Sequence, residues 1–242
     1  MGKIRFAFSI ILILVLPVLL LGCSRVSSSV NGSGKIIDQD IKVTDFNRIT
    51  IEGAFDVEIF RAPHYAVTIS TDENLVNRVL VSRENKTLRL RIQAPSTFLP
   101  TQLKARIGLP GIESLSLSDM AKAGISGFTS APYFYLFLKN GSSLNGSLEA
   151  EATHFNLSGA SKVSLTGKSN KLNLDCSGSS KLDLSNFFLD SAVVKLREAS
   201  EVTLNVDGRF DVFLSDESKV YYLGNPFFGN TSVSSCSLMV HK

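Results

Sequence analysis

The segment Leu157–Val163 (LSGASKV) decides the fold, because close copies of it recur along the C-terminal half of the chain. The clear copies are CSGSSKL from Cys176, LREASEV from Leu196 and LSDESKV from Leu214, and the weaker ones are LSDMAKA from Leu117 and LKNGSSL from Leu138. Subtracting these positions gives starts that lie 21, 19, 19, 20 and 18 residues apart. A repeat of about 20 residues is typical of a solenoid, in which each repeat forms one coil and stacks on its neighbours.

Apolar residues alternate with polar ones on both sides of each copy, as in two β-strands that meet at a bend. Before the bend the apolar pairs are Leu115/Leu117, Leu136/Leu138, Phe155/Leu157, Leu174/Cys176, Val194/Leu196 and Val212/Leu214. After the bend they are Ala123/Ile125, Val163/Leu165, Leu182/Leu184, Val202/Leu204 and, less regularly, Val220/Tyr222. One coil cannot cover its own apolar face. We therefore predict an all-β fold, a right-handed parallel β-helix (β-solenoid) with about five or six coils over residues 101–222.

The residues ahead of the repeats, 35–100, predict an N-terminal block rich in strands. In Ile49–Phe60 apolar and polar residues alternate, and further strands are expected at 66–70, 79–82 and 88–92. A helical turn is expected at Asp72–Asn77.

The C-terminal residues, 223–242, predict a cap or tail. Gly224–Gly229 interrupts the alternation, and a last strand is expected at Ser232–Val240. Caps are expected at both ends of a solenoid because open strand edges invite aggregation.

The first residues, 1–22, predict export from the cell. An apolar run of about 16 residues, Phe6–Leu21, follows a basic start and ends at Leu20-Leu21-Gly22-Cys23. This segment resembles a bacterial lipoprotein signal peptide, in which Cys23 is lipidated and becomes the first mature residue. The alternative is an uncleaved membrane anchor. Residues 23–34, which are rich in Gly and Ser, are expected to form a flexible tether.

The charge of the remaining chain excludes a typical nucleic-acid-binding protein. Removing Lys3 and Arg5 from the 25 basic residues leaves 23, against 22 acidic residues. Proteins that neutralise phosphates need a basic excess, so no nucleic-acid partner is expected. Cys176 and Cys236 lie about three coils apart, too far for a disulfide, and Cys176 takes the place of a core leucine. We expect it to be a buried thiol.

Serines occupy the same corner position in five copies: Ser142, Ser161, Ser180, Ser200 and Ser218. Stacked in register, their hydroxyls would lie ~4.8 Å apart and could line a strip for sugars. The alternative, which we favour, is that they satisfy backbone groups at a tight bend.

A row of lysines follows these serines, namely Lys122, Lys162, Lys181 and Lys219, interrupted by Ser143 and Glu201. The row could bind an acidic polysaccharide or anionic lipid headgroups. The alternative is that solvated charges keep a β-surface soluble.

The densest aromatic cluster is Tyr133–Phe137, with Phe128 nearby. Alternation points Phe134 inward and Tyr133, Tyr135 and Phe137 outward. Exposed aromatic side chains are typical of a contact surface, so we expect these three to meet a glycan or a protein partner. The alternative is cover by the loop around Phe98 and Leu99.

Catalytic motifs are not found in the sequence. The three histidines lack metal-ligand spacing, and no nucleophile elbow, phosphate-binding loop or zinc-protease motif occurs. Asp56 and Glu58 share a strand face and could serve in glycoside cleavage, although solvent-facing charges explain them equally well. Calcium binding at Asp72–Asn74 is less favoured than helix N-capping. We expect no enzyme, no cofactor and no metal.

The chain resembles a known family over residues 32–222. The stretches that carry the resemblance are GSGKII from Gly32, DFNRITIEGAFDVEIF from Asp45, VTISTDENLVNRV from Val67 and TLRLRI from Thr87, followed by the SGASKV coils. They resemble the head GIN domain, a bacterial family described as auto-transporter adhesins. The resemblance implies an extracytoplasmic β-solenoid. The aromatic patch at Tyr133–Phe137 and the tail after Tyr222 depart from the family pattern.

Taken together, these features predict a non-enzymatic, lipid-anchored protein of the cell envelope or surface. A rigid solenoid face would bind a glycan or a surface protein through many weak contacts. The alternatives are a carbohydrate-active β-helix enzyme and a purely structural envelope lipoprotein. The sequence sets no oligomeric state.

Overall fold

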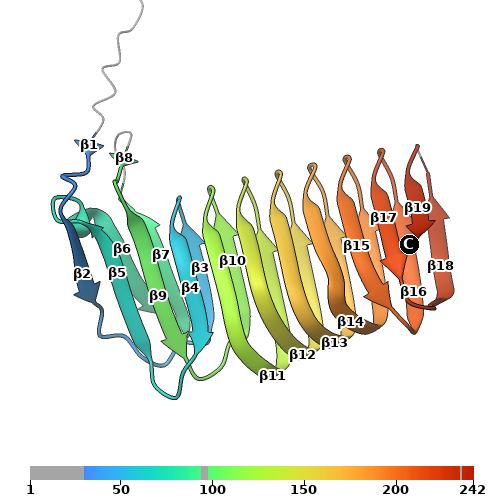
Figure 1. Ribbon diagram of the computed structural model, residues 1–242, viewed down its shortest axis with the longest axis horizontal. Helices are drawn as coiled ribbons and strands as arrows, with labels where there is room; N and C mark the ends of the chain where they lie inside the picture. The colour runs from blue at the N-terminus through green and yellow to red at the C-terminus, as the bar shows by residue number, and fades with distance from the viewer. Residues whose placement is uncertain (1–29, 94–97, 235) are drawn as a thin grey trace, which may run out of the picture.

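The computed structural model of the protein describes residues 30–93, 98–234 and 236–242. They form an elongated stack of strands with about seven turns, about 19 residues apart (Figure 1). The predicted all-β parallel solenoid is confirmed. Within the described residues the one helical segment is a short 3₁₀ helix, η2 (Val76–Arg78), which begins later than the expected turn at Asp72–Asn77. The predicted signal peptide (1–22) and the lipidation site Cys23 lie outside the described residues.

The strands occur in a simple order along the chain. They are β1 (Val30–Asn31), β2 (Ile36–Asp40), β3 (Arg48–Glu52), β4 (Asp56–Arg61), β5 (Ala66–Asp72), β6 (Val79–Glu84), β7 (Thr87–Ile92), β8 (Phe98–Leu99), β9 (Leu103–Leu109), β10 (Ser114–Ser118), β11 (Lys122–Leu138), β12 (Ser143–Leu157), β13 (Lys162–Cys176), β14 (Lys181–Leu196), β15 (Glu201–Val206), β16 (Arg209–Leu214), β17 (Lys219–Leu223), β18 (Phe227–Val233) and β19 (Leu238–His241).

Two facing sheets make up the regular part of the solenoid. Each long strand from β11 to β14 begins after a tight corner in one sheet, bends, and ends before the next corner in the other sheet (Figure 1). We call these the post-corner and pre-corner sheets. The post-corner sheet continues through β15, β17 and β19, and the pre-corner sheet through β16 and β18.

Equivalent apolar side chains stack into columns between the two sheets. Leu157 is opposite Leu138 and Cys176, and the column continues through Leu196 and Leu214. All five side chains are buried. Each coil therefore covers the apolar face of the next, which is how short strands with little core of their own become stable.

The corners stack as regularly as the strands. At each corner two successive residues have a positive φ, for example Gly159 (63°) and Ala160 (62°). The N–H of the second residue donates to the carbonyl of the first corner residue in the next coil, as from Ala160 to Gly178 at 2.7 Å. Gly, Ala, Ser, Asn and Asp occupy most of these positions because the left-handed conformation disfavours larger side chains, although Met120, Glu198 and Glu217 also adopt it.

The N-terminal block adds coils to the stack and then closes it. Strands β3 and β4 run parallel to β10 and β11, and β7 and β9 run parallel to β3 and β4. Strands β6 and β5 pair antiparallel with β7 and β9, and β2 pairs antiparallel with β5. These irregular coils explain why the stack has more turns than the repeats alone predict.

The end of the expected tether belongs to the folded body. Strand β1 pairs with β8, and the N–H of Gly34 donates to Asp72 at 2.8 Å. Residues 30–34 are therefore attached, and the tether boundary expected at residue 34 lies too far along the chain. The sequence did not indicate this because the partners, Asp72 and Leu99, are distant in the chain and outside the repeat.

The C-terminal residues extend the solenoid by one more coil. Gly224–Gly229 was expected to break the pattern and fold over the end, but β18 begins within it and pairs in parallel with β16. The single strand expected at Ser232–Val240 is divided, with β19 beginning at Leu238 after a further corner. Phe228 packs edge-on against Tyr222 and partly closes the core.

Candidate functional site

A groove of about 640 Å³ opens at the bend of the first long strand. Its walls come from β11, from the β9–β10 connection, from the end of β4 with the β4–β5 connection, and from Asn47 just before β3. The charged side chains and tyrosines of the lining are Arg61, Tyr65, Glu113, Tyr133 and Tyr135. The groove therefore lies where the N-terminal block meets the regular coils.

An interruption of the stacking explains the groove. Strand β4 pairs with the first half of β11, but the chain leaves this coil after Arg61 and returns as β5 on the far side of β9. The second half of β11 therefore has β10 beside it only from Tyr135 onward. Gly127, with φ +82°, allows β11 to bend here against the Arg61 backbone.

The aromatic patch lies on the outer surface of the pre-corner sheet, as the alternation predicts. Tyr133 and Phe137 are 54% and 46% exposed, Tyr135 is half-buried, and Phe134 is buried in the core. The loop of Leu99 is not part of the groove lining, and Leu99 is itself exposed. The patch is thus open to a partner on the described surface.

The aromatic surface continues onto the next coil. The imidazole of His154 stacks on the ring of Tyr135, with centroids 5.0 Å apart and 12° between the planes. Asn173 follows His154 in register, and Asn156 and Asp175 follow Phe137. This surface combines flat rings with amide and carboxylate groups, which suits a ligand that has both apolar faces and hydroxyls.

The polar wall of the groove is held in place by ion pairing. Glu113 accepts hydrogen bonds from Arg48 at 2.8 Å and from the side-chain amide of Asn47 at 3.0 Å. The Oδ1 atom of Asn47 is buried and has no hydrogen-bond partner among the described residues. Arg61 takes part in none of the ion pairs found in the described part of the chain. The groove therefore offers a rigid carboxylate and an unpaired guanidinium.

The predicted row of lysines is in register but lies elsewhere. Lys122, Ser143, Lys162, Lys181, Glu201 and Lys219 align at the start of the post-corner strands. Lys181 lies 3.7 Å from Glu201, and Lys122 is opposite Asp56. The row is thus partly neutralised, and it belongs to the sheet opposite the aromatic patch, so the two predicted sets do not form one surface.

The corner serines are structural. All five are fully buried, and the hydroxyls of Ser142 and Ser161 donate to the carbonyls three residues earlier, both at 2.7 Å. The hydroxyls of Ser142, Ser161 and Ser218 donate to backbone carbonyls and that of Ser180 accepts the N–H of Ser161, as the favoured interpretation holds, whereas the Ser200 hydroxyl has no partner among the described residues. They do not line a surface for sugars.

Two acidic residues, one considered for catalysis and one within the calcium candidate, have partners of their own. Glu58 pairs with Arg106 at 2.7 Å on the exposed side of β4, and Glu73 pairs with Lys35 at 3.0 Å. Within the described residues no three metal-binding side chains gather into a cluster. The same residues contain no helix long and apolar enough to cross a membrane.

Asp72 has a structural role instead. It is buried and accepts backbone N–H groups from Gly34 and Thr101, each at 2.8 Å. Burial raises the pKa of Asp72, but these backbone hydrogen bonds outweigh it and hold the pKa below its usual value. The carboxylate thus fastens residues 30–34 to the N-terminal cap.

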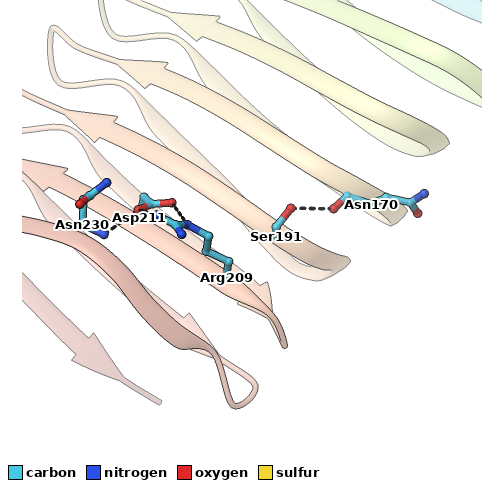
Figure 2. A network of polar contacts seen from close by, with 5 residues as sticks. All are labelled: Asn170, Ser191, Arg209, Asp211 and Asn230. Carbon is cyan, nitrogen blue, oxygen red and sulfur yellow. Dashed lines mark hydrogen bonds and ion pairs between the residues drawn. The ribbon is translucent and has the colours of Figure 1, made fainter.

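A second structural carboxylate lies near the far end of the pre-corner sheet (Figure 2). Arg209 donates to Asp211 at 2.7 and 2.9 Å, and the backbone N–H of Asn230 donates to it at 2.6 Å. These hydrogen bonds lower the pKa of Asp211 to about 2. Figure 2 also shows the Ser191 hydroxyl donating to the carbonyl of Asn170 at 3.1 Å, a similar link between coils.

Comparison with known proteins places this geometry in a family. A family model described as "Putative auto-transporter adhesin, head GIN domain" matches residues 45–226. No curated protein matches the chain.

Solved structures share the fold at low sequence identity. A putative adhesin from Bacteroides fragilis NCTC 9343 superposes with a TM-score of 0.81 at 17% identity, over 88% of this chain and 100% of its own. A putative adhesin from Parabacteroides merdae ATCC 43184 gives 0.75 at 15% identity, over 88% and 99%. A putative lipid binding protein from Parabacteroides distasonis ATCC 8503 gives 0.64 at 16% identity, over 89% and 100%. These similarities show the β-solenoid fold.

Proposed function

Because the chain belongs to the putative auto-transporter adhesin, head GIN domain family, we propose that it is a non-enzymatic surface protein that binds a glycan. The ligand would lie in the groove and along the aromatic surface of the pre-corner sheet. One observation supports this most directly: Tyr133, Tyr135 and His154 lie beside a groove whose wall contains a fixed carboxylate.

Sugar rings have the chemistry that this site would accept. The axial C–H groups of a pyranose pack on aromatic faces, and exposed Tyr133 with half-buried Tyr135 presents two such faces. Glu113 would accept hydroxyl hydrogen bonds, and Arg61 would donate to ring or carboxylate oxygens. Because the solenoid is rigid, little order is lost on binding.

Binding is better supported than cleavage. Glycoside hydrolysis uses two carboxyl groups roughly 5–10 Å apart across the scissile bond. Among the described residues that line the groove, Glu113 is the one acidic side chain, and Arg48 and Asn47 already bind it. A site of this kind holds a sugar without supplying an acid and a base.

The proposal includes attachment to a membrane through Cys23. Residues 23–29 would join the lipid to β1, and the groove would face outward from an exported, extracytoplasmic domain. A lipidated cysteine carries more than one acyl chain, which gives firm anchoring because each buried methylene contributes ~0.8 kcal/mol.

A glycan and matrix-protein array tests the proposal with the chain from Ser24 onward, which contains every described strand. We expect selective glycan binding that Tyr133→Ala and Tyr135→Ala each weaken about tenfold, since each ring supplies ~1.4 kcal/mol of contact. Phe188→Ala is the matched control, because Phe188 is 60% exposed on another part of the solenoid.

Three outcomes would contradict the proposal. Unchanged binding by both tyrosine variants would remove the site. Release of reducing sugar ends would indicate an enzyme. No binding to any array would favour a purely structural envelope lipoprotein.

A further inference from the structure

The last coil leaves both of its strands open at the C-terminal end of the stack (Figure 1). Strand β18 pairs with β16 and β19 pairs with β17, and within the described residues neither has a partner on its outer side. Their outward N–H and C=O groups are a template for another strand, so this end needs cover.

The chemistry of this edge differs from that of the opposite end. Neither β18 (FFGNTSV) nor β19 (LMVH) contains an Asp, Glu, Lys or Arg. Every residue of β18 is exposed, and Phe227 and Phe228 are 63% and 44% exposed. At the N-terminal end, by contrast, β2 carries Asp38 and Asp40, and β6 carries Arg83 and Glu84. Charged edge strands resist pairing, and uncharged ones favour it.

We propose that β18 and β19 form the interface of a homodimer in which two copies join end to end at their last coils. The occupant is a second copy because the edge is self-complementary: β18 and β19 both lack charged residues, so each strand of one copy meets an uncharged strand of the other. Head-to-tail stacking would instead require the charges of β2 and β6 to lose water against Phe227 and Phe228. A two-fold axis also closes the assembly, because the edges that remain open are the charged ones of β2 and β6.

The orientation follows from the anchoring in the proposed function, on which this step rests. Strand β1, which leads to the N-terminus, lies on the same side of the solenoid as the corners (Figure 1). Two copies on one membrane must point their corners the same way, so the two-fold axis runs along the strands. Strand β18 then pairs antiparallel with the partner's β19, and the two last corners meet at the axis.

Cys236 lies in that corner and is exposed, with φ +60°. Adjacent strands lie ~4.8 Å apart, and disulfides form between Cα atoms roughly 4.4–6.8 Å apart. The two Cys236 thiols of the dimer would therefore lie within reach of each other. Diamide, an azo oxidant, can join them: it takes up two electrons and two protons as the S–S bond forms.

Light scattering after size exclusion tests the dimer with the chain from Ser24 onward, and it needs no glycan. We expect twice the chain mass for the unmodified protein and for Phe188→Lys, and the single chain mass for Phe227→Lys. The two variants form a matched pair because both phenylalanines are more than half exposed, at 60% and 63%. Circular dichroism shows whether each variant keeps its strands.

Crosslinking tests the orientation. Diamide should convert the protein to a covalent dimer on a non-reducing gel, and Cys236→Ser should abolish this band while leaving the light-scattering mass doubled. A folded protein of single mass, or a dimer that Phe227→Lys leaves intact, would overturn the interface. A dimer that diamide does not crosslink would overturn the arrangement of its corners. If the unmodified protein forms the dimer but binds no glycan, that result would contradict the proposed function and leave the dimer interface standing.

Discussion

The imidazole of His154 lies parallel to the ring of Tyr135, with the ring centroids 5.0 Å apart. The two residues are opposite each other on adjacent coils, so the pairing of β11 with β12 fixes the stack. The edge of the groove is therefore set by the backbone ladder rather than by a flexible loop. A binding surface built this way keeps its shape before the ligand arrives.

Replacing His154 should weaken glycan binding without unfolding the protein. His154→Ala removes the ring that orients Tyr135, and aromatic pairs are worth about 0.5–1.5 kcal/mol, which predicts a loss of roughly two- to tenfold in affinity. Asn145→Ala, on the opposite sheet, is the control. Titration calorimetry of both variants checks the prediction, and equal affinities would contradict it.

The core column predicts a large stability difference between neighbouring residues. Leu174 is fully buried and Asn173 is exposed on the same strand. Leu174→Ala should lower the free energy of unfolding by about 2–5 kcal/mol, and Asn173→Ala should change it by less than about 0.5 kcal/mol. Urea unfolding followed by circular dichroism measures both, and similar values would argue against the inward column.

The left-handed backbone positions, one at a corner and one at the bend inside β13, predict opposite signs for two reciprocal substitutions. Ala160 has φ +62°, so Ala160→Gly should stabilise the protein by about 0.5 kcal/mol as the left-handed strain is relieved. Gly167 has φ +127°, and a Cβ there would lie 2.0 Å from the carbonyl oxygen of Leu148. Gly167→Ala should therefore destabilise by more than about 1 kcal/mol. Thermal unfolding compares them, and a shift of the same sign in both variants would refute the argument.

Asp211 predicts a loss of stability in acid. Its folded pKa of about 2 lies below its value in the unfolded chain, ~3.9. A lowered pKa stabilises the fold above the unfolded value, and this contribution disappears as the pH falls through the folded value. Asp211→Asn should thus be less stable than the wild type at pH 6, with the gap closing between pH 4 and pH 2. A gap that stays constant over that range would contradict the role of the carboxylate.

The two described cysteines should differ sharply in reactivity. Burial raises the pKa of Cys176 to about 11, whereas Cys236 is exposed. In the native chain from Ser24 onward, Ellman's reagent should therefore modify one thiol quickly, and it should modify both after denaturation. Cys236→Ser should leave no fast-reacting thiol. Rapid reaction of that variant would show that Cys176 is accessible and that the buried column of side chains around it is open to solvent.

The regular coils could be predicted from the sequence because one spacing determines them. Leu157 and Cys176 are 19 residues apart and lie opposite each other on adjacent strands. The order of the N-terminal coils could not be predicted. Strands β7 and β9 come later in the chain than β3 and β4 but stack on their outer side, between them and the antiparallel strands β6 and β5. Periodicity carries no information about such long-range pairing.

The residues of the candidate site also fall into two groups, those that the sequence could predict and those that it could not. Alternation alone places Tyr133 and Tyr135 on the outer surface, and the repeat spacing would also have placed His154 beside Tyr135. Tyr65 and Glu113 could not be found, since they come from connections between strands, and Arg61 is the last residue of β4, next to such a connection, where neither alternation nor repeat spacing applies.

A crystal structure of the chain from Ser24 onward with a glycan selected on the array tests the central claim most directly. We predict a sugar ring packed on Tyr133 or Tyr135, with a hydroxyl bound to Glu113. A glycan bound instead along Lys122, Lys162 and Lys181 would contradict the assignment of the groove as the binding site.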